Sequence, residues 1–383
     1  MVTLRKSVLV SLMALLMMAA SFNVASSTET RVGSMGGIGL YTHDNSNIFF
    51  FPGAIFTYSG QVVGELRSKG NDNDYSIGIH YPYGSYSVIG VYLNRPISLS
   101  IPSGIVNTVD LNQTTDIFYG TQLTNYDLGL KLSVGLDNAK QDVGADEDKE
   151  SAFLFGLGGG LSNETMDLGL DLRFPSAKRD SAGTEWKWSG FGIGFNGRMF
   201  HGETTKLVPL VVFGYTSTSA ETDTVPPATP PAKVDYRNFN LGIGVGINHQ
   251  MNENNLLVMG LEVLGYNSFK TDIDGGDETT VTTVTMPGLY MGVESKVKNW
   301  LTGRLGAAQV YQGTKTKVNP QVGNDVESSS RSSQFNVSFG LGFTFGDFLI
   351  DAAINEGLFF DGPNFISGGV NPMANRLSVT YNF

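Results

Sequence analysis

Apolar and polar residues alternate along most of this chain with a period of two. The clearest runs are Tyr126–Asp137, Phe239–Asn248 and Phe335–Gly346, where Leu, Ile, Val, Phe or Tyr occupies every second position. This period predicts β-strands with one apolar face. Each run is about ten residues long, the length that a tilted strand needs to cross the hydrocarbon of a bilayer. A soluble β-sandwich shows the same alternation, so the pattern alone leaves both architectures open.

The connections between the runs distinguish the two architectures, because short and long connections alternate. This asymmetry is typical of outer-membrane barrels, which have short turns on the periplasmic side and long loops outside. We therefore predict an all-β fold, a transmembrane antiparallel up-and-down β-barrel of about 14–16 strands. The first strands are expected near Ser59–Arg67, Tyr75–Tyr81, Tyr86–Asn94 and Thr115–Gln122. Short turns are expected near Ser162–Thr165, Phe200–Thr205, Met251–Asn255, Lys298–Trp300 and Gly346–Asp347, and long polar loops near Asn138–Glu150, Pro175–Thr184, Ala220–Lys233, Thr271–Thr279, Gln312–Ser333 and Glu356–Met373.

Both ends of the chain agree with export to an outer membrane. Arg5 and Lys6 precede a short apolar run and then small residues, which predicts a cleaved signal peptide over residues 1–26. The last strand places Leu377, Val379, Tyr381 and Phe383 on one face and ends on Phe383. This ending resembles the C-terminal signature of bacterial outer-membrane barrels. The resemblance implies an assembly signal on these four residues that the barrel-assembly machinery reads.

Some positions interrupt the pattern. Trp186 and Trp188 share parity with glycines of the same run, so either a bulge changes the register or both Trp side chains project into the lumen. Pro209 and Pro287 fall within apparent strands and predict bulges or strand ends. The Pro96–Gln113 stretch is a candidate for a loop that folds into the lumen.

Residues 27–58 do not alternate, and they resemble the start of FadL-type and PorV-type outer-membrane proteins. Met35-Gly36-Gly37, Asp44-Asn45 and Phe51-Pro52 carry the resemblance, whereas Gly53 departs from the Asn-Pro-Ala usual in those families. The resemblance implies a segment that plugs the lumen, followed by a barrel over residues 59–383. The other interpretation is an ordinary periplasmic N-terminus. The possible plug residues are Met35, Gly36, Gly37, Asp44, Phe49, Phe50, Phe51 and Pro52.

Composition and charge narrow the function classes. The formal net charge of −11 becomes −13 when Arg5 and Lys6 are removed with the signal peptide, which disfavours nucleic-acid binding. The chain has no Cys and only four His, without a nucleophile–base grouping or metal-ligand spacing, so we expect no enzyme activity, metal or cofactor. The Gly192–Gly197 run matches a dinucleotide-loop spelling but lies in a strand pattern, which predicts small inward-facing residues instead. The acidic Asp142–Glu150 stretch is interpreted as a solvated surface loop rather than a divalent-cation site.

Charged residues at the polar parity are the main functional clue. They predict a polar, water-filled lumen and hence a porin-like channel for passive diffusion of small solutes. One alternative is a FadL-like transporter of hydrophobic compounds, with Phe49–Phe51 and Phe359–Phe360 as candidate pocket residues. Another is a non-transporting, secretion-associated barrel of the PorV type. The expected partners are outer-membrane lipid and lipopolysaccharide, the barrel-assembly machinery and small solutes. The predicted lumen-lining residues are Asp127, Lys131, Asp167, Asp171, Arg173, Glu262, Glu294, Lys296, Arg304 and Arg376.

Overall fold

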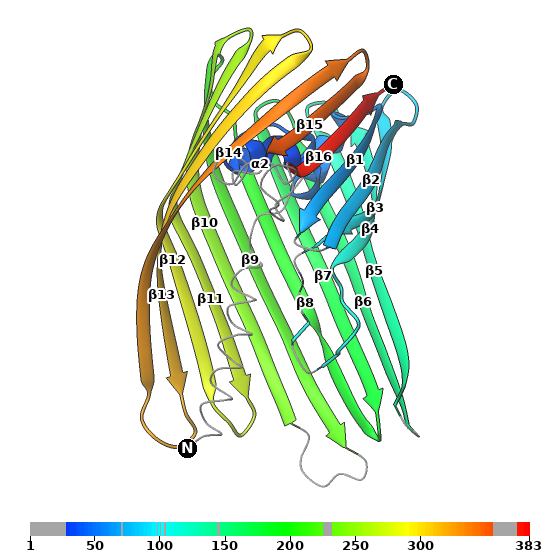
Figure 1. Ribbon diagram of the computed structural model, residues 1–383, viewed down its shortest axis with the longest axis vertical. Helices are drawn as coiled ribbons and strands as arrows, with labels where there is room; N and C mark the ends of the chain where they lie inside the picture. Colours follow the sequence, from blue (N-terminus) through cyan, green and yellow to red (C-terminus); the bar gives the residue numbers. More distant parts are fainter. Residues whose placement is uncertain are drawn as a thin grey trace, which may run out of the picture.

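In the computed structural model, the described residues form sixteen antiparallel strands that close into one barrel (Figure 1). Each strand pairs with its neighbours in sequence, and the first strand pairs with the last. The structure describes residues 28–383 apart from 70–71, 98, 100, 103–104, 144–145, 225–231 and 355–373. The predicted signal peptide and Phe359–Phe360 lie outside the described residues. The predicted barrel and its upper strand count are confirmed.

The elements have the following bounds. From residue 28 onward, four short helices precede the barrel: α2 (Glu29–Ser34), η2 (Ile38–Tyr41), η3 (Asn45–Phe49) and η4 (Pro52–Phe56). None of the described helices is long and apolar enough to cross a membrane. The strands are β1 (Gln61–Lys69), β2 (Asp72–Pro82), β3 (Ser87–Pro96), β4 (Gln113–Gln122), β5 (Asp127–Val143), β6 (Asp146–Ser162), β7 (Met166–Ser181), β8 (Thr184–Met199), β9 (Thr205–Thr224), β10 (Ala232–Asn252), β11 (Asn255–Ile273), β12 (Glu278–Lys298), β13 (Leu301–Asn319), β14 (Val326–Phe345), β15 (Phe348–Ile354) and β16 (Ala374–Asn382).

The wall of the barrel has two heights. The strands β1–β4, β15 and β16 contain 7 to 11 residues, whereas β5–β14 contain 16 to 21. A tilted strand of about 9–11 residues already crosses the hydrocarbon. The longer strands therefore continue past the membrane at the end opposite the C-terminus, and Figure 1 shows them reaching well below the short strands.

These extensions explain a difference from the sequence expectation. Polar stretches expected as long loops, such as Pro175–Thr184, continue as paired strands joined by tight hairpins. The turn between β7 and β8 needs only Ala182 and Gly183, both with positive φ. Beyond the hydrocarbon the outer face of a strand meets water instead of lipid, so the backbone ladder continues without an apolar outer parity. Pattern reading cannot detect such a strand because it relies on that alternation.

The positions that interrupt the alternating pattern have different local structures. The register between β12 and β13 shifts between Thr285 and Gly288, which confirms the predicted irregularity at Pro287. Pro209 causes no shift against β10, but pairing with β8 ends one residue away at Leu210. The β7–β8 and β8–β9 registers run without a shift past Trp188, and this side chain is buried against lumen residues. The interpretation of inward-facing Trp side chains is therefore confirmed there, without a bulge.

The outward face of the barrel is apolar. Exposed large hydrophobic side chains occur on one parity of successive strands, for example Leu130, Leu157 and Leu170 at 44 to 51 % exposure. Burial of this belt in lipid removes an aggregation hazard that it would create in water. The predicted assembly residues Leu377, Val379, Tyr381 and Phe383 have outward parity, and the rings of Tyr381 and Phe348 lie 4.7 Å apart. Their role in assembly remains a prediction.

Residues 28–60 lie inside the barrel near the end that carries the C-terminus, and we call them the plug (Figure 1). Inward-facing glycines of the wall accommodate the plug backbone. A Cβ at Gly129 would lie 2.0 Å from the carbonyl oxygen of Pro52, and one at Gly169 would lie 1.8 Å from that of Phe50. A real Cβ cannot approach another atom this closely. The glycines of the alternating runs are therefore sockets for the plug.

A pair of neighbouring glycines in β6 tests this interpretation. Gly160 faces Pro52, whose Cδ would lie 2.8 Å from an added Cβ, whereas at Gly159 the nearest atom is Leu130 Cδ2 at 3.8 Å. We expect Gly160→Val to lower the free energy of unfolding, measured by urea titration in detergent micelles, by about 1–3 kcal/mol because it overpacks the socket. Gly159→Val should change it by less than about 0.5 kcal/mol. Equal effects of the two substitutions would contradict a socket at Gly160.

Candidate functional site

The plug packs against the wall through two apolar clusters. The first joins Phe49, Phe51 and Ile55 to Val88 and Phe118 on the inner faces of β3 and β4. The rings of Phe49 and Phe118 meet edge to face, with centroids 5.7 Å apart. Because Phe51 and Ile55 are fully buried, this part of the plug forms a core with the wall rather than a free lining.

The second cluster lies on the other side of the lumen. Met35, Ile38 and Tyr41 pack with Leu210 and Val258 from β9 and β11. The ring of Tyr41 lies over glycines of the wall, since a Cβ at Gly246 or Gly260 would come within 2.6 Å of it. The aromatic and glycine positions of plug and wall are thus complementary in shape.

Arg198, on β8, is the principal polar contact between wall and plug. Its side chain is fully buried, and its guanidinium forms an ion pair with Asp167 at 2.8 Å. Its Nη1 donates hydrogen bonds to the carbonyl oxygens of Leu40 and Thr42 at 2.9 and 2.7 Å. The same guanidinium lies over the ring of Phe51, 4.6 Å from its centroid. One side chain thus joins β7, β8 and two parts of the plug.

His43 lies beside this group without adding a second positive charge. Its ring stacks on Phe200 with centroids 3.9 Å apart, and its Nδ1 is 3.9 Å from Asp167. Partial desolvation of the imidazole, whose side chain is 41 % exposed, and the neighbouring Arg198 guanidinium lower the pKa of His43 to about 4 despite the opposing effect of Asp167. The imidazole is therefore neutral at pH 7, and Arg198 alone balances the carboxylate.

A second polar chain crosses the lumen from the plug to β15. Arg31 pairs with Asp44 within the plug at 2.7 Å and with Glu294 on β12 at 2.8 Å. Glu294 also pairs with Arg304 on β13 at 2.7 Å, and Arg304 pairs with Asp351 on β15 at 2.6 Å. Charges of opposite sign alternate along this series of ion pairs, so each carboxylate faces a guanidinium.

A third polar group holds the start of the plug. Glu29 pairs with Arg67 on β1 at 2.6 Å and with Arg376 on β16 at 3.4 Å. The backbone N–H of Glu29 donates to Glu65, which also pairs with Arg67 at 2.7 Å. These contacts attach the plug directly to the two strands that close the ring.

The remaining predicted lumen residues differ in their surroundings. Lys131 is buried, donates to the carbonyl oxygen of Phe49 at 3.2 Å and pairs with Asp171 at 2.7 Å, which in turn pairs with Arg173. Glu262 accepts a hydrogen bond from the Tyr290 hydroxyl at 2.9 Å. Asp127 is half-buried at the start of β5, and Lys296 is exposed near the end of β12.

The possible plug residues also have definite places. Met35, Phe51, Pro52 and Asp44 are buried, and Phe49 is nearly so. Phe50 is half-buried at the edge of the first apolar cluster. Gly36 and Gly37 both have positive φ, and a Cβ on Gly36 would lie 2.9 Å from backbone atoms of Ala307. The close backbone approach requires glycine at position 36, and the positive φ favours glycine at position 37, where an added Cβ would meet no atom within 4 Å.

The sequence interpretation missed several charged residues of the site. Arg198 continues the parity of Gly192, Gly194 and Asn196, so the alternation could have identified it. Asp116 on β4, which is fully buried between Arg95 and Ser133, could have been found in the same way. Glu29 and Arg31 lie outside any alternating run, and no local signal marks them.

The half of the lumen away from the C-terminus holds a different surface. Ile105, Val109 and Leu111, from the segment between β3 and β4, pack on Leu154 and Trp188 of the inner wall. The expectation that this segment folds into the lumen is therefore confirmed for its described residues. Glu150 on β6 fixes the segment by accepting backbone hydrogen bonds from Asn107 and Thr108, both at 2.8 Å. We call this group the outer apolar cluster, which also contains Ala152, Ala177 and Ala220 and contacts Ile97, Leu99, Ile101, Val106, Trp186, Val234 and Tyr236.

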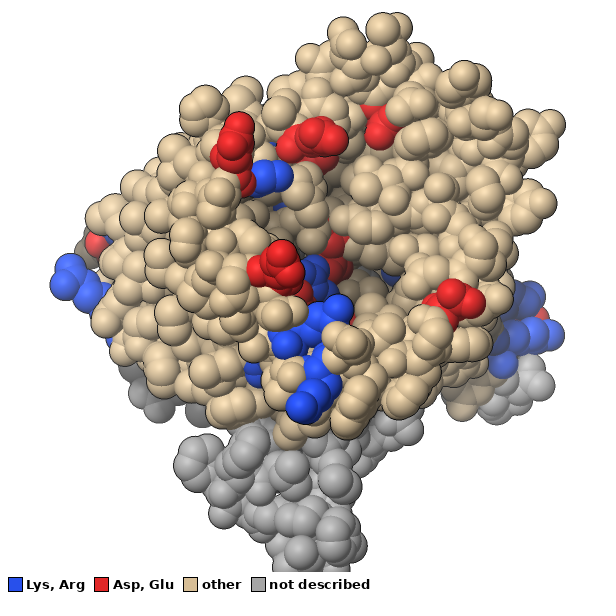
Figure 2. Space-filling model, turned by 90° about the horizontal axis from the view of Figure 1, so that it is seen from above, with Lys and Arg blue, Asp and Glu red and all other residues tan. Residues whose placement is uncertain are grey.

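Figure 2 shows the face that carries the C-terminus, where Lys, Arg, Asp and Glu side chains gather around and within a central hollow. The residues that the structure describes contain no group of three or more His, Asp or Glu placed to hold a metal ion.

Comparisons with known proteins show similarity to solved barrels only. The chain is 13 % identical to a TodX deltaS2S3 mutant, a monoaromatic hydrocarbon channel, with 94 % of this chain and 100 % of that chain covered and a TM-score of 0.41. It is 9 % identical to the CymD monoaromatic hydrocarbon channel, with 92 % of this chain and 97 % of that chain covered and a TM-score of 0.41. It is 11 % identical to the Pseudomonas putida toluene transporter TodX, with 92 % of this chain and 98 % of that chain covered and a TM-score of 0.36. Neither a family model nor a curated protein sequence matches this chain.

The Arg198–Asp167 pair provides a test of plug attachment. Arg198→Met leaves a buried carboxylate without a partner, so we expect a loss of about 3–5 kcal/mol in the free energy of unfolding. Adding Asp167→Asn should recover part of this loss, because the uncompensated charge is then gone. Urea titration measures both, and proteolysis within residues 28–60 reports release of the plug.

An exposed pair serves as the control for this experiment. Lys187 and Glu185 lie on the extension of β8 with side chains 50 % and 26 % exposed. Lys187→Met should cost no more than about 1 kcal/mol. A loss of that size for Arg198→Met as well would show that the buried pair does not anchor the plug.

Proposed function

We propose that this protein is an outer-membrane channel that admits small hydrophobic compounds through an apolar outer vestibule and past a lumenal plug. The observation that carries the proposal is the outer apolar cluster on the inner wall of the barrel. It favours the hydrophobic-transporter alternative over the open, polar porin.

The charges of the lumen support this choice. A porin filter needs charged side chains that face water and permeating ions. Here Arg198 and Arg304 are buried and engaged with Asp167 and Asp351, and Arg31 neutralises Glu294. Paired charges beneath plug backbone hold the plug in place, and they leave little net field along the lumen.

The outer apolar cluster also supports the hydrophobic-transporter alternative. Trp188 is only 3 % exposed, and it lies on a wall that a water-filled vestibule would line with polar groups. Apolar ligands gain roughly 25 cal/mol for each Å² of apolar surface that they remove from water. A surface of Leu154, Trp188 and Tyr236, covered by an inward segment, suits a hydrophobic compound that exchanges contacts with that segment.

Tryptophan fluorescence tests the proposal. In a Trp300→Phe background, Trp186 and Trp188 are the remaining tryptophans. Bromobenzene and a brominated fatty acid serve as probes, because bromine quenches tryptophan only near contact. We expect saturable quenching by at least one probe, and loss of saturation in Ile105→Asp, which places a charge in the apolar cluster.

Single-channel conductance of the same preparation separates the alternatives. A plugged channel for hydrophobic compounds should show no steady, ohmic conductance in a planar bilayer. Stable ohmic steps without saturable quenching would establish the porin instead. A folded barrel that shows neither property and co-purifies with large proteins would support the secretion-associated alternative.

A further inference from the structure

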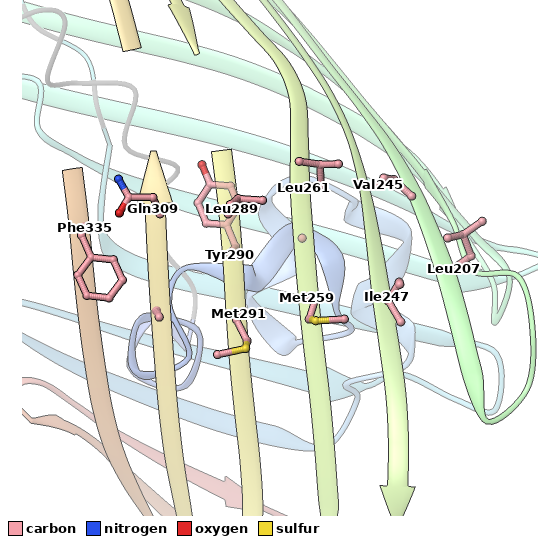
Figure 3. A pocket seen from close by; sticks show the side chains of 12 residues that line it. Leu207, Val245, Ile247, Met259, Leu261, Leu289, Tyr290, Met291, Gln309 and Phe335 are labelled. Atoms are coloured by element: carbon pink, nitrogen blue, oxygen red, sulfur yellow. The ribbon is translucent and has the colours of Figure 1, made fainter. Parts of the chain in front are cut away.

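A groove of about 440 Å³ runs across the outside of the barrel from β9 to β14. The inner side of the same part of the wall contacts the plug. Figure 3 shows the side chains of the groove on the strands, with the plug ribbon behind them. Met259 and Met291 are 38 % and 43 % exposed, which places both on the lipid-facing parity. Val245 and Ala307 also line the groove, and Phe335 lies at one end.

The concave outer surface follows from close packing on the inside. A Cβ at Gly306 would lie 2.0 Å from the backbone nitrogen of Gly36, and one at Gly292 would lie 2.7 Å from the carbonyl oxygen of Met35. The wall of β12 and β13 therefore approaches the plug at backbone distance, which draws the outer surface inward.

Breaks in the strand register reinforce this shape. The β10–β11 register shifts between Ile243 and Gly244, and the β12–β13 register shifts between Thr285 and Gly288. Such irregularities bend a strand and increase its local twist. Both lie just beyond the groove on its extracellular side, because Leu261 and Leu289 line the groove. The groove is therefore a consequence of how this barrel holds its plug.

We propose that the groove binds one acyl chain of a glycerophospholipid from the leaflet beside the short turns. The groove is continuous with the apolar belt that faces lipid, so hydrocarbon chains are the molecules that reach it. It begins at Leu207, two positions into β9, and ends at Phe335, ten positions before the end of β14. At about 3.3 Å per residue and a tilt of about 45°, ten positions cover about 23 Å along the membrane normal, so the groove begins in the leaflet beside the short turns and extends past the middle of the hydrocarbon.

The chemistry of the groove fits a flexible chain. Met259 and Met291 are unbranched and adapt to an irregular partner. Leu207, Val245 and Ala307 present only hydrocarbon, and the two polar side chains of the lining, Tyr290 and Gln309, carry no formal charge.

The end of the groove near the short turns fits a phospholipid head group. Lys298, at the end of β12, pairs with Leu301, which has the outward parity of Leu305. It is exposed and forms no ion pair with the residues that the structure describes. Trp300 follows in the same turn and is 49 % exposed, a position typical of the membrane interface. Basic side chains near the surface attract anionic lipid. The groove and this basic turn together match an apolar chain joined to a phosphate.

Lipid counting by native mass spectrometry tests the proposal. The full-length mature protein is reconstituted into vesicles of phosphatidylethanolamine and phosphatidylglycerol and then released into a mild detergent. We expect one phospholipid to remain bound to the wild type. Ala307→Phe places a ring in the groove and should reduce the bound fraction by about tenfold or more, which corresponds to about 1.4 kcal/mol.

Two further variants complete the experiment. Val245→Phe fills the groove from β10 and tests the same site if Ala307→Phe fails to fold. Ala352→Phe places an identical ring on the lipid face of β15, outside the groove, where Ala352 pairs with Leu377. This control should retain the bound lipid, and heat-modifiable migration in gels verifies that each barrel is folded.

Three outcomes would overturn the proposal. A wild-type barrel without retained phospholipid would show that the groove has no specific occupant. Retention unchanged in the folded groove variants would place the lipid elsewhere. A mass of two barrels that Ala307→Phe converts to one would make the groove an interface between copies of this chain.

Discussion

The closure of the hydrogen-bond ladder between β1 and β16 is the constraint on which the rest of this structure depends. Hydrocarbon offers no partner to a backbone N–H or C=O, so a sheet within it cannot have a free edge. Gln61 to Arg67 pair in register with Asn382 to Arg376 and remove that edge. Closure with consecutive antiparallel strands requires an even strand number and brings both ends of the barrel to one rim. The plug, which precedes β1, therefore enters from this rim.

Polar groups inside the ring follow a second constraint, since each buried charge needs a partner. Paired buried charges contribute little net stability, but the removal of one partner is costly. The pairs of Glu29, Arg31 and Arg198 thus specify where the plug lies more than they stabilise it. The apolar clusters around Phe51 and Met35 supply the favourable burial. Position and stability come from different sets of contacts.

Much of this architecture could be predicted from the sequence, and the limits have physical causes. Where strands lie in lipid, the two faces must differ, so the alternation located the ends of β1–β4 within three residues and identified Lys131, Asp171 and Arg304 as lumenal. Where strands leave the lipid, as after Ser176 in β7, alternation is no longer required and the extensions went undetected. Partners in the lumen depend on which strands face each other across the ring. No local pattern therefore linked Arg31 to Glu294, or indicated that paired charges would replace an open filter.

The plug also restricts the circumference of the barrel. Glu29 reaches β1 and β16, Gly36 meets the backbone of β13, and Pro52 lies against Gly129 of β5 and Gly160 of β6. These contacts are spaced around the whole perimeter and allow almost no radial play, because several are backbone against backbone. In a barrel with one hairpin more, these plug–wall contacts would be separated, and in a barrel with one hairpin fewer, the plug and wall would clash. A segment of some thirty residues thereby restricts a wall ten times its length to a single size.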